Sequence, residues 1–308
     1  MSRNRSTTAI TSALGLALLL GCMAVAGGSL SGTGQTSKAS SSAQPSQPAM
    51  VFQLLDAQSS PTVFAHANSA RDALGFPVGT SRSGKHVQDG FQHAEYDQVD
   101  ELDSTGRPIS TTQLDKSGRV ISAVRFDEIA HPASRIGRDA ALQTARKAAT
   151  SAGVTVTGTT YADVDPATDG WTIRWSRIQD GISVRGDETR VQVRPDGRIQ
   201  SLARTEHGLA ATPARQIKSD EARQRVAAKA DGWFTARGSS YTIDSIDLEW
   251  VGPNGAFDPT KSIDPQPVYS LAWVANVKPS GDASKYLWLV TVYIDAGDGS
   301  VIGGDFVE

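Results

Sequence analysis

Two groups of residues come near the spacing of catalytic or zinc-binding motifs. A serine hydrolase needs Gly-x-Ser-x-Gly, but in Gly-Thr-Ser-Arg-Ser-Gly, from Gly79 to Gly84, the second glycine stands one position too late. We therefore interpret this stretch as a serine-rich loop. His86 and His93 with Glu95 carry zinc-binding side chains, but neither their spacing nor a fixed helix would hold them around one ion. We expect ordinary surface histidines there.

A third group, Asp163, Asp165 and Asp169, has the carboxylates of a calcium loop. An EF-hand loop needs oxygen ligands at fixed positions and a closing glutamate at the twelfth. Counted from Asp163, Ala167 stands at the fifth position and Arg174 at the twelfth, so the pattern favours a solvated turn. The sequence thus predicts no cofactor, no metal site and no catalytic residue, and hence a non-enzymatic protein.

The tryptophans are candidates for a recognition surface. We expect four of them, on alternating or buried strands, to fill the core: Trp171, Trp175, Trp273 and Trp288. Trp233 and Trp250 are the tentative partner-binding residues, and one of them exposed beside a sheet edge would mark the partner site.

The only cysteine, Cys22, lies in an N-terminal leader. The basic region from Met1 to Arg5 carries two arginines, and an uncharged apolar run from Ala9 to Leu20 follows it, as in an export signal. The stretch Leu-Leu-Gly-Cys that ends at Cys22 resembles a bacterial lipobox, which implies cleavage before the cysteine and lipidation of its thiol and new amino group. This would anchor the chain at the outer face of the cytoplasmic membrane.

Two other interpretations of the leader remain open. Cleavage after Ala26, in Ala-Val-Ala, would release the protein, and an uncut Thr7 to Leu30 is long enough for a membrane-spanning helix. All three place the rest of the chain outside the cytoplasm. We divide this part into a signal or anchor segment, 1–26, and a flexible Ser-, Gly- and Pro-rich tether, 27–49.

The composition fits a soluble body and argues against nucleic-acid binding. Hydrophobic residues make up 39% of the chain and charged residues 20%, with a formal net charge of -3. Nucleic-acid binding requires clustered Lys and Arg, and these are interspersed with acidic residues here.

The sequence of residues 50–308, the body of the protein, predicts an α+β fold. Residues 50–133 are expected to hold a short helix, Ser69 to Leu74, and a β-meander with two near-copies of one Asp-Gly turn. In each of two further units, 134–211 and 212–308, the pattern predicts a helix followed by strands in which apolar and polar residues alternate. Gly153 is predicted to end the helix of the first unit. Aligning Ile136 with Ile217 suggests that these two units are diverged copies.

Particular residues of these units resemble PepSY domains and the related propeptide domains of thermolysin-like proteases. The stretches that carry the resemblance are Trp171–Trp175, Asp180–Asp187, Val191–Ile199 and Val292–Ile302. The resemblance covers about 134–308 and implies tandem units of one helix on an antiparallel sheet, a PepSY/cystatin-like arrangement. It also implies a role outside the membrane, such as inhibiting or chaperoning a peptidase, with no shared catalytic residue.

The leading hypothesis is a membrane-anchored, extracytoplasmic binding or regulatory protein that acts on a peptidase or another envelope protein. The chain has no His-Glu-x-x-His, so a peptidase target would act in trans. One alternative is a carrier or sensor of a small apolar ligand, which needs a cavity between helix and sheet. The other is an envelope hydrolase with unidentified acidic residues, which needs a cleft with paired carboxylates.

Overall fold

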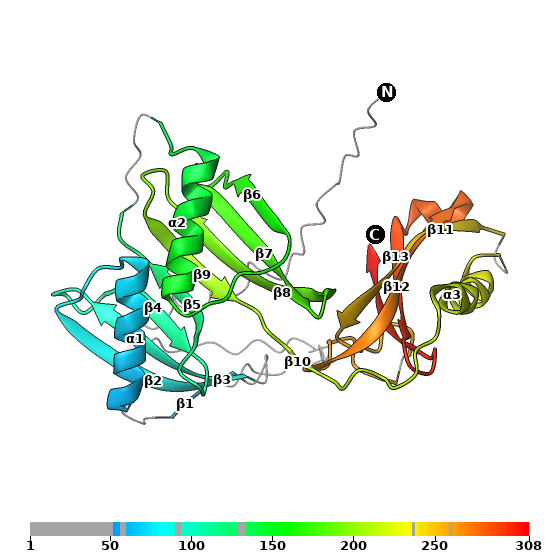
Figure 1. The fold of residues 1–308 in the computed structure, drawn as a ribbon, viewed down its shortest axis with the longest axis horizontal. Helices are drawn as coiled ribbons and strands as arrows, with labels where there is room; N and C mark the ends of the chain where they lie inside the picture. Colours follow the sequence, from blue (N-terminus) through cyan, green and yellow to red (C-terminus); the bar gives the residue numbers. More distant parts are fainter. Residues whose placement is uncertain are drawn as a thin grey trace, which may run out of the picture. The chain divides into compact units, whose positions relative to one another are not determined.

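The structure is a computed structural model that describes residues 52–55, 60–89, 94–128, 134–235, 238–258 and 260–307 (Figure 1). Met50–Glu308 form one compact unit. The predicted leader with Cys22 and the predicted tether lie outside the described residues. In the part that the structure describes, no helix has the length and apolar character needed to cross a membrane.

One order of elements, a helix followed by four strands, occurs three times. The first copy comprises α1 (Pro61–Leu74), β2 (Ser81–Asp89), β3 (Ala94–Leu102), β4 (Pro108–Leu114) and β5 (Val120–Arg125). The second copy comprises α2 (Arg138–Ser151), β6 (Thr160–Val164), β7 (Trp171–Gln179), β8 (Ile182–Val193) and β9 (Ile199–Arg204). The third copy comprises α3 (Ser219–Trp233), β11 (Ser240–Val251), β12 (Val268–Ser280), β13 (Leu289–Asp295) and β14 (Val301–Val307). The remaining elements are β1 (Phe52–Leu55), β10 (Gly208–Leu209) and the 3-10 helix η4 (Gly281–Lys285).

The helices α1 and α2 end in the same way. Just beyond each of them a glycine takes a left-handed conformation: Gly75 and Gly153, with φ of 64° and 76°. The N–H of the following residue donates back to the last turn of the helix, as Val154 does to Ala149 at 2.9 Å. Because glycine adopts this conformation without steric cost, these positions set where each helix stops. The predicted stop at Gly153 is confirmed.

The first and second copies share one sheet and one core. Their last strands, β5 and β9, pair antiparallel, so the strand order from β1 to β5 continues through β9 and β8 to β7 and β6. α1 and α2 lie side by side on one face of this sheet (Figure 1). Their small residues, such as Ala67 and Ala145, pack in one apolar cluster with Leu202 of β9. Residues 50–133 and 134–211 therefore fold against each other.

The third copy has its own core, in which α3 covers β11, β12 and β13 (Val226, Val277 and Val292 are buried there). A short parallel pairing of β11 with β8 connects its strands to those of the second copy, and β10, in the chain that follows β9, pairs with β12. The α+β class is confirmed. The predicted division into a meander region and two helix-on-sheet units captures only part of the arrangement, because all strands belong to one hydrogen-bonded system.

The second and third copies repeat one tertiary contact. The indole N–H of Trp171 donates to Ile136 C=O at 2.8 Å, and that of Trp273 donates to Ile217 C=O at 3.0 Å. The alignment of Ile136 with Ile217 thus corresponds to equivalent positions in space. In both copies a tryptophan of a strand thus holds, by this hydrogen bond, the chain that leads into the helix.

Candidate binding site

β6 is an edge strand whose outer side is open. Among the described strands it pairs with β7 alone, and Asp165 N–H donates to Gly170 C=O beyond the end of their ladder. Hydrogen-bonded positions alternate in an antiparallel pair, so Asp163 and Tyr161 also direct their backbone groups to β7. Three residues direct N–H and C=O away from β7, and no described residue bonds to these groups: Thr160, Ala162 and Val164.

The side chains of these outward residues lie on the face of the sheet that α2 covers. Thr160 pairs with Trp175 and Ala162 with Ile173, and cross-strand partners point to the same face. Trp175 is 2% exposed and Ile173 is fully buried in the core beneath α2. A strand added to β6 would therefore direct every second side chain toward α2.

A tight approach and a turn position β6. A Cβ at Gly158, which precedes the strand with φ of 85°, would lie 2.1 Å from the carbonyl oxygen of Ser176, so only glycine fits there. After the strand, the Asp165 carboxylate accepts from Ala167 N–H at 2.9 Å and closes the turn to β7. Asp163 pairs with Arg174 across the strands. This cluster of carboxylates is the solvated turn that the spacing predicts.

A pocket of about 470 Å³ lies beside the start of β6. Its walls come from Arg146 and Thr150 of α2, the segment 153–158 and Trp175 of β7. Arg146 is exposed and makes no ion pair with a described residue. The lining contains no aspartate or glutamate, so Arg146 gives the pocket a net positive charge. The buried indole N–H of Trp175 has no hydrogen-bond partner among the described residues.

β14, the edge strand of the third copy, is covered instead. Asn254 N–H donates to Ile302 C=O at 3.0 Å, and its side-chain amide donates to Gly304 C=O at 2.9 Å and accepts from Gly304 N–H at 3.0 Å. A Cβ at Gly303 would lie 2.5 Å from the Asn254 Oδ1, so glycine permits this approach. Asn254 thus takes the place that an added strand would occupy beside Ile302 and Gly304.

The free edge of β11 carries charge. Asp244 and Asp247 are exposed on it, and the Arg223 guanidinium donates to Ile243 C=O at 3.2 Å. Charged side chains on an edge discourage pairing with another strand. Of these three edges, β6 offers the clearest run of free backbone groups.

The two tentative partner-binding tryptophans lie in different surroundings. Trp250 is 3% exposed and packs in a core cluster with Val184 and Leu271. It is therefore not the exposed tryptophan beside a sheet edge that would mark a partner site. Trp233 is partly buried and stacks on Phe257, with ring centroids 4.6 Å apart. Their role in binding stays a prediction.

Three of the four tryptophans expected in the core contribute to it. Trp175 is buried, and Trp171 and Trp273 pack against the cores with their indole N–H groups bonded. The prediction for Trp288 is wrong, because this side chain is 49% exposed. Trp288 precedes β13, and full burial in this strand begins only at Val290.

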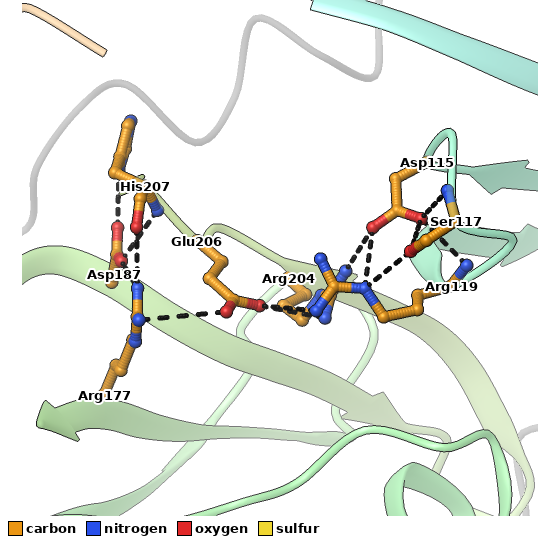
Figure 2. Close-up of polar contacts among 8 residues, drawn as sticks. All are labelled: Asp115, Ser117, Arg119, Arg177, Asp187, Arg204, Glu206 and His207. Atoms are coloured by element: carbon orange, nitrogen blue, oxygen red, sulfur yellow. Dashed lines mark hydrogen bonds and ion pairs between the residues drawn. The ribbon is translucent and has the colours of Figure 1, made fainter. Parts of the chain in front are cut away.

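A polar network joins β7, β8 and the chain that follows β9 (Figure 2). The fully buried Asp187 carboxylate accepts from Arg177 at 2.9 Å and from the His207 backbone N–H at 2.9 Å. The His207 Nδ1 lies 2.5 Å from the other oxygen of Asp187, and the imidazole stacks on Tyr269 with centroids 4.2 Å apart. Burial, with the charges of Asp187 and Asp305, raises the pKa of Tyr269 to about 12.

This network anchors the chain. Each oxygen of Asp187 already has a partner, Tyr269 stays neutral, and no hydroxyl or thiol of a described residue bonds to His207. A histidine–carboxylate pair activates a serine or cysteine only when that nucleophile is within hydrogen-bond reach of the imidazole. The arrangement therefore holds the start of the connection to the third copy in place.

The network continues to the β4–β5 turn through Glu206 and Arg204, whose guanidinium lies 3.2 Å from Asp115 (Figure 2). Burial alone would raise the pKa of Asp115. Hydrogen bonds from the Ser117 hydroxyl and from Arg119 outweigh it and lower the pKa to about 2. The network thus also connects the first and second copies.

The structure places the other motif candidates in strands. Ser81 and Ser83 lie in β2, paired with β3, so the interpretation as a serine-rich loop is wrong: cross-strand pairing outweighs the local turn character of Ser and Gly. His86 bonds to Asp97 at 3.0 Å, Glu95 pairs with Lys116, and His93 lies outside the described residues. Within the described ranges no three His, Cys, Asp or Glu side chains gather as metal ligands.

The features of the β6 site escaped the sequence-based prediction. Thr160–Val164 is short and mixed in character, so it gave no strand signal. Arg146 stands on a helix where polar residues are ordinary. Gly158 was the one local signal, because a glycine there permits the close approach of the chain before β6 to the Ser176 carbonyl of β7.

No model of a known protein family matches the sequence, and a comparison with curated proteins found no match. Among solved structures, the Bacillus megaterium YpeB C-terminal domain matches with a TM-score of 0.44 and 11% sequence identity. The match covers 82% of this chain and 99% of that one. A likeness of this extent carries no argument about family or function, and the conclusions below rest on the geometry of the chain.

Proposed function

We propose that the chain is a binding protein that takes up an extended segment of a partner as an additional strand at β6. The observation that carries this proposal is the row of free N–H and C=O groups on Thr160, Ala162 and Val164. In strand addition, main-chain hydrogen bonds supply affinity and pockets for alternate side chains supply specificity. β6 combines both, because its outward residues and the pocket lie on the same face.

The setting of this activity is part of the proposal. We place the body outside the cytoplasm, held by a lipid at Cys22 and spaced from the membrane by the tether 27–49. The resemblance to PepSY domains supports a regulatory role toward a peptidase or another envelope protein, in trans. An accessible segment of such a partner would be the added strand.

The polar lining of the pocket does not favour the carrier of a small apolar ligand, because Arg146 and threonine hydroxyls would lose hydration without gaining partners. The hydrolase alternative needs paired carboxylates in a cleft. The described lining of this pocket has none.

The test uses residues 50–308, which form one compact unit. A phage-displayed decapeptide library is selected against this protein, and the amide hydrogen exchange of the complex is followed by NMR. We expect bound peptides to slow exchange at Thr160, Ala162 and Val164, whose N–H groups are free in the unbound protein. Asp163, whose N–H already faces β7, should change little.

Protection confined to β11 or β14, or a library that yields no binder, would overturn the proposal. Capture from the envelope fraction of the source cells then identifies the natural partner. The expected partner is retained by the wild-type protein and lost with Ala162→Pro.

A further inference from the structure

The pocket beside β6 has a chemical preference that backbone pairing alone does not explain. Arg146 supplies a guanidinium without a described ionic partner, and the rest of the lining is neutral. A free arginine that lines a concave site recognises planar anions, above all carboxylates, through paired N–H donors. The positive charge of the pocket therefore favours a ligand with an acidic group.

The position of the pocket indicates which side chains of an added strand could carry the acidic group. Trp175 is both a wall of the pocket and the cross-strand partner of Thr160. An added residue opposite Thr160 or Ala162 projects its side chain to the α2 face, as these residues do. Such a side chain lies on the face of the sheet that also carries the pocket, whereas its two chain neighbours point to the opposite face.

We propose that the pocket binds the carboxylate of an acidic side chain, carried by the extended segment that pairs with β6, through Arg146. This deepens the proposed function and rests on it. The volume of about 470 Å³ exceeds one side chain, so a neighbouring alternate residue also fits between α2 and the edge. The preferred partner is thus an extended segment with glutamate or aspartate at a position that faces α2.

Trp175 provides a reporter inside the site. Its buried indole N–H is unpaired among the described residues, whereas those of Trp171 and Trp273 are bonded to carbonyl groups. A ligand that fills the pocket changes the surroundings of the Trp175 ring. We expect the NMR resonance of its indole N–H to move, and that of Trp273, in the third copy, to stay.

The experiment compares two capped decapeptides in which threonine alternates with valine and one central residue is Glu or Gln. Their affinities are measured on wild-type residues 50–308, Arg146→Gln and Arg138→Gln. Arg138 is a matched control, because it is also exposed on α2 but does not line the pocket. We expect the Glu peptide to bind about tenfold more tightly than the Gln peptide. Arg146→Gln should abolish this preference, and Arg138→Gln should keep it.

The outcomes separate the two proposals. Equal affinity of the Glu and Gln peptides, or a preference that survives Arg146→Gln, would overturn the carboxylate inference while protection of the Ala162 amide still supports strand addition. If free glutarate competes as well as the Glu peptide, the pocket recognises a small acid and the peptide source is wrong. If neither peptide protects the Ala162 amide, the proposed function itself fails.

Discussion

β6 and β14 are both edge strands with outward backbone groups, but in β14 Asn254 covers those of Ile302 and Gly304. At β14 the Asn254 amide pairs with both backbone groups of Gly304. At β6, Thr160, Ala162 and Val164 have no such partner among the described residues, and a positively charged pocket lies beside the chain that leads into the strand. Exposed edges invite association and proteins commonly block them. Because this chain covers part of the β14 edge and places charges on the β11 edge, we interpret the uncovered edge of β6 as a binding site.

The largest expected effect concerns the direction of N–H groups in β6. Ala162→Pro removes an outward N–H, so we expect peptide affinity to fall about 100-fold while the protein keeps its stability. Asp163→Pro removes the adjacent inward N–H and should lower the free energy of unfolding by about 3 kcal/mol. Peptide titration and urea unfolding measure the two effects. Equal destabilisation by both variants would contradict the assigned alternation.

The second prediction opens the covered edge. Asn254→Ala removes two side-chain hydrogen bonds to Gly304, which should cost about 2 kcal/mol of unfolding free energy and expose β14 to pairing. We expect concentration-dependent self-association in light scattering. Thr260→Ala is the control, since among the described residues its hydroxyl bonds to Asp258 alone, in the same connection. An Asn254→Ala protein that stays monomeric would show that Asn254 does not protect this edge.

The third prediction compares the copies that carry the two edges. Trp171→Phe and Trp273→Phe each leave a carbonyl without its indole donor, and each should lower the unfolding free energy by about 1 kcal/mol. Trp288→Phe, at a half-exposed position, should have little effect. Denaturant unfolding of all three variants tests this. Unequal losses at Trp171 and Trp273 would mean that the two contacts do not play equivalent roles.

The smallest expected effect is the loss of stability at low pH that comes from Asp115, and it limits the pH range in which binding at the edges can be measured. The depressed pKa of Asp115, about 2 against 3.8 unperturbed, stabilises the fold above pH 4 and is lost as pH falls toward 2. Asp115→Asn should therefore flatten the stability profile only in this window, as thermal unfolding would show. Binding of the Glu peptide should weaken near pH 4, where its own carboxylate takes up a proton. A wild-type profile as flat as that of the variant would contradict this role for Asp115.

Local patterns predicted the elements of the second and third copies better than those of the first. The apolar spacing and Gly153 located α2, and Asp-Gly turns located the hairpins. α1 was expected only from Ser69, but it begins at Pro61, where the Ser60 side chain caps it. β2 and β3 gave no alternating signal because polar residues fill much of both strands, including a buried Glu101 that pairs with Arg71 and Arg82. Ion pairs formed between distant segments compensate there for weak local patterns.

The sequence by itself determined the α+β class, the turns and the likeness of the last two copies, because backbone conformation and side-chain periodicity are local properties. Only the tertiary structure decided that β5 pairs with β9, that Asn254 covers β14 and that nothing described covers β6. A strand carries the same backbone groups whether it lies at an edge or in the middle of a sheet. What lies beside it depends on segments far away in the chain, and this is where the proposed binding site originates.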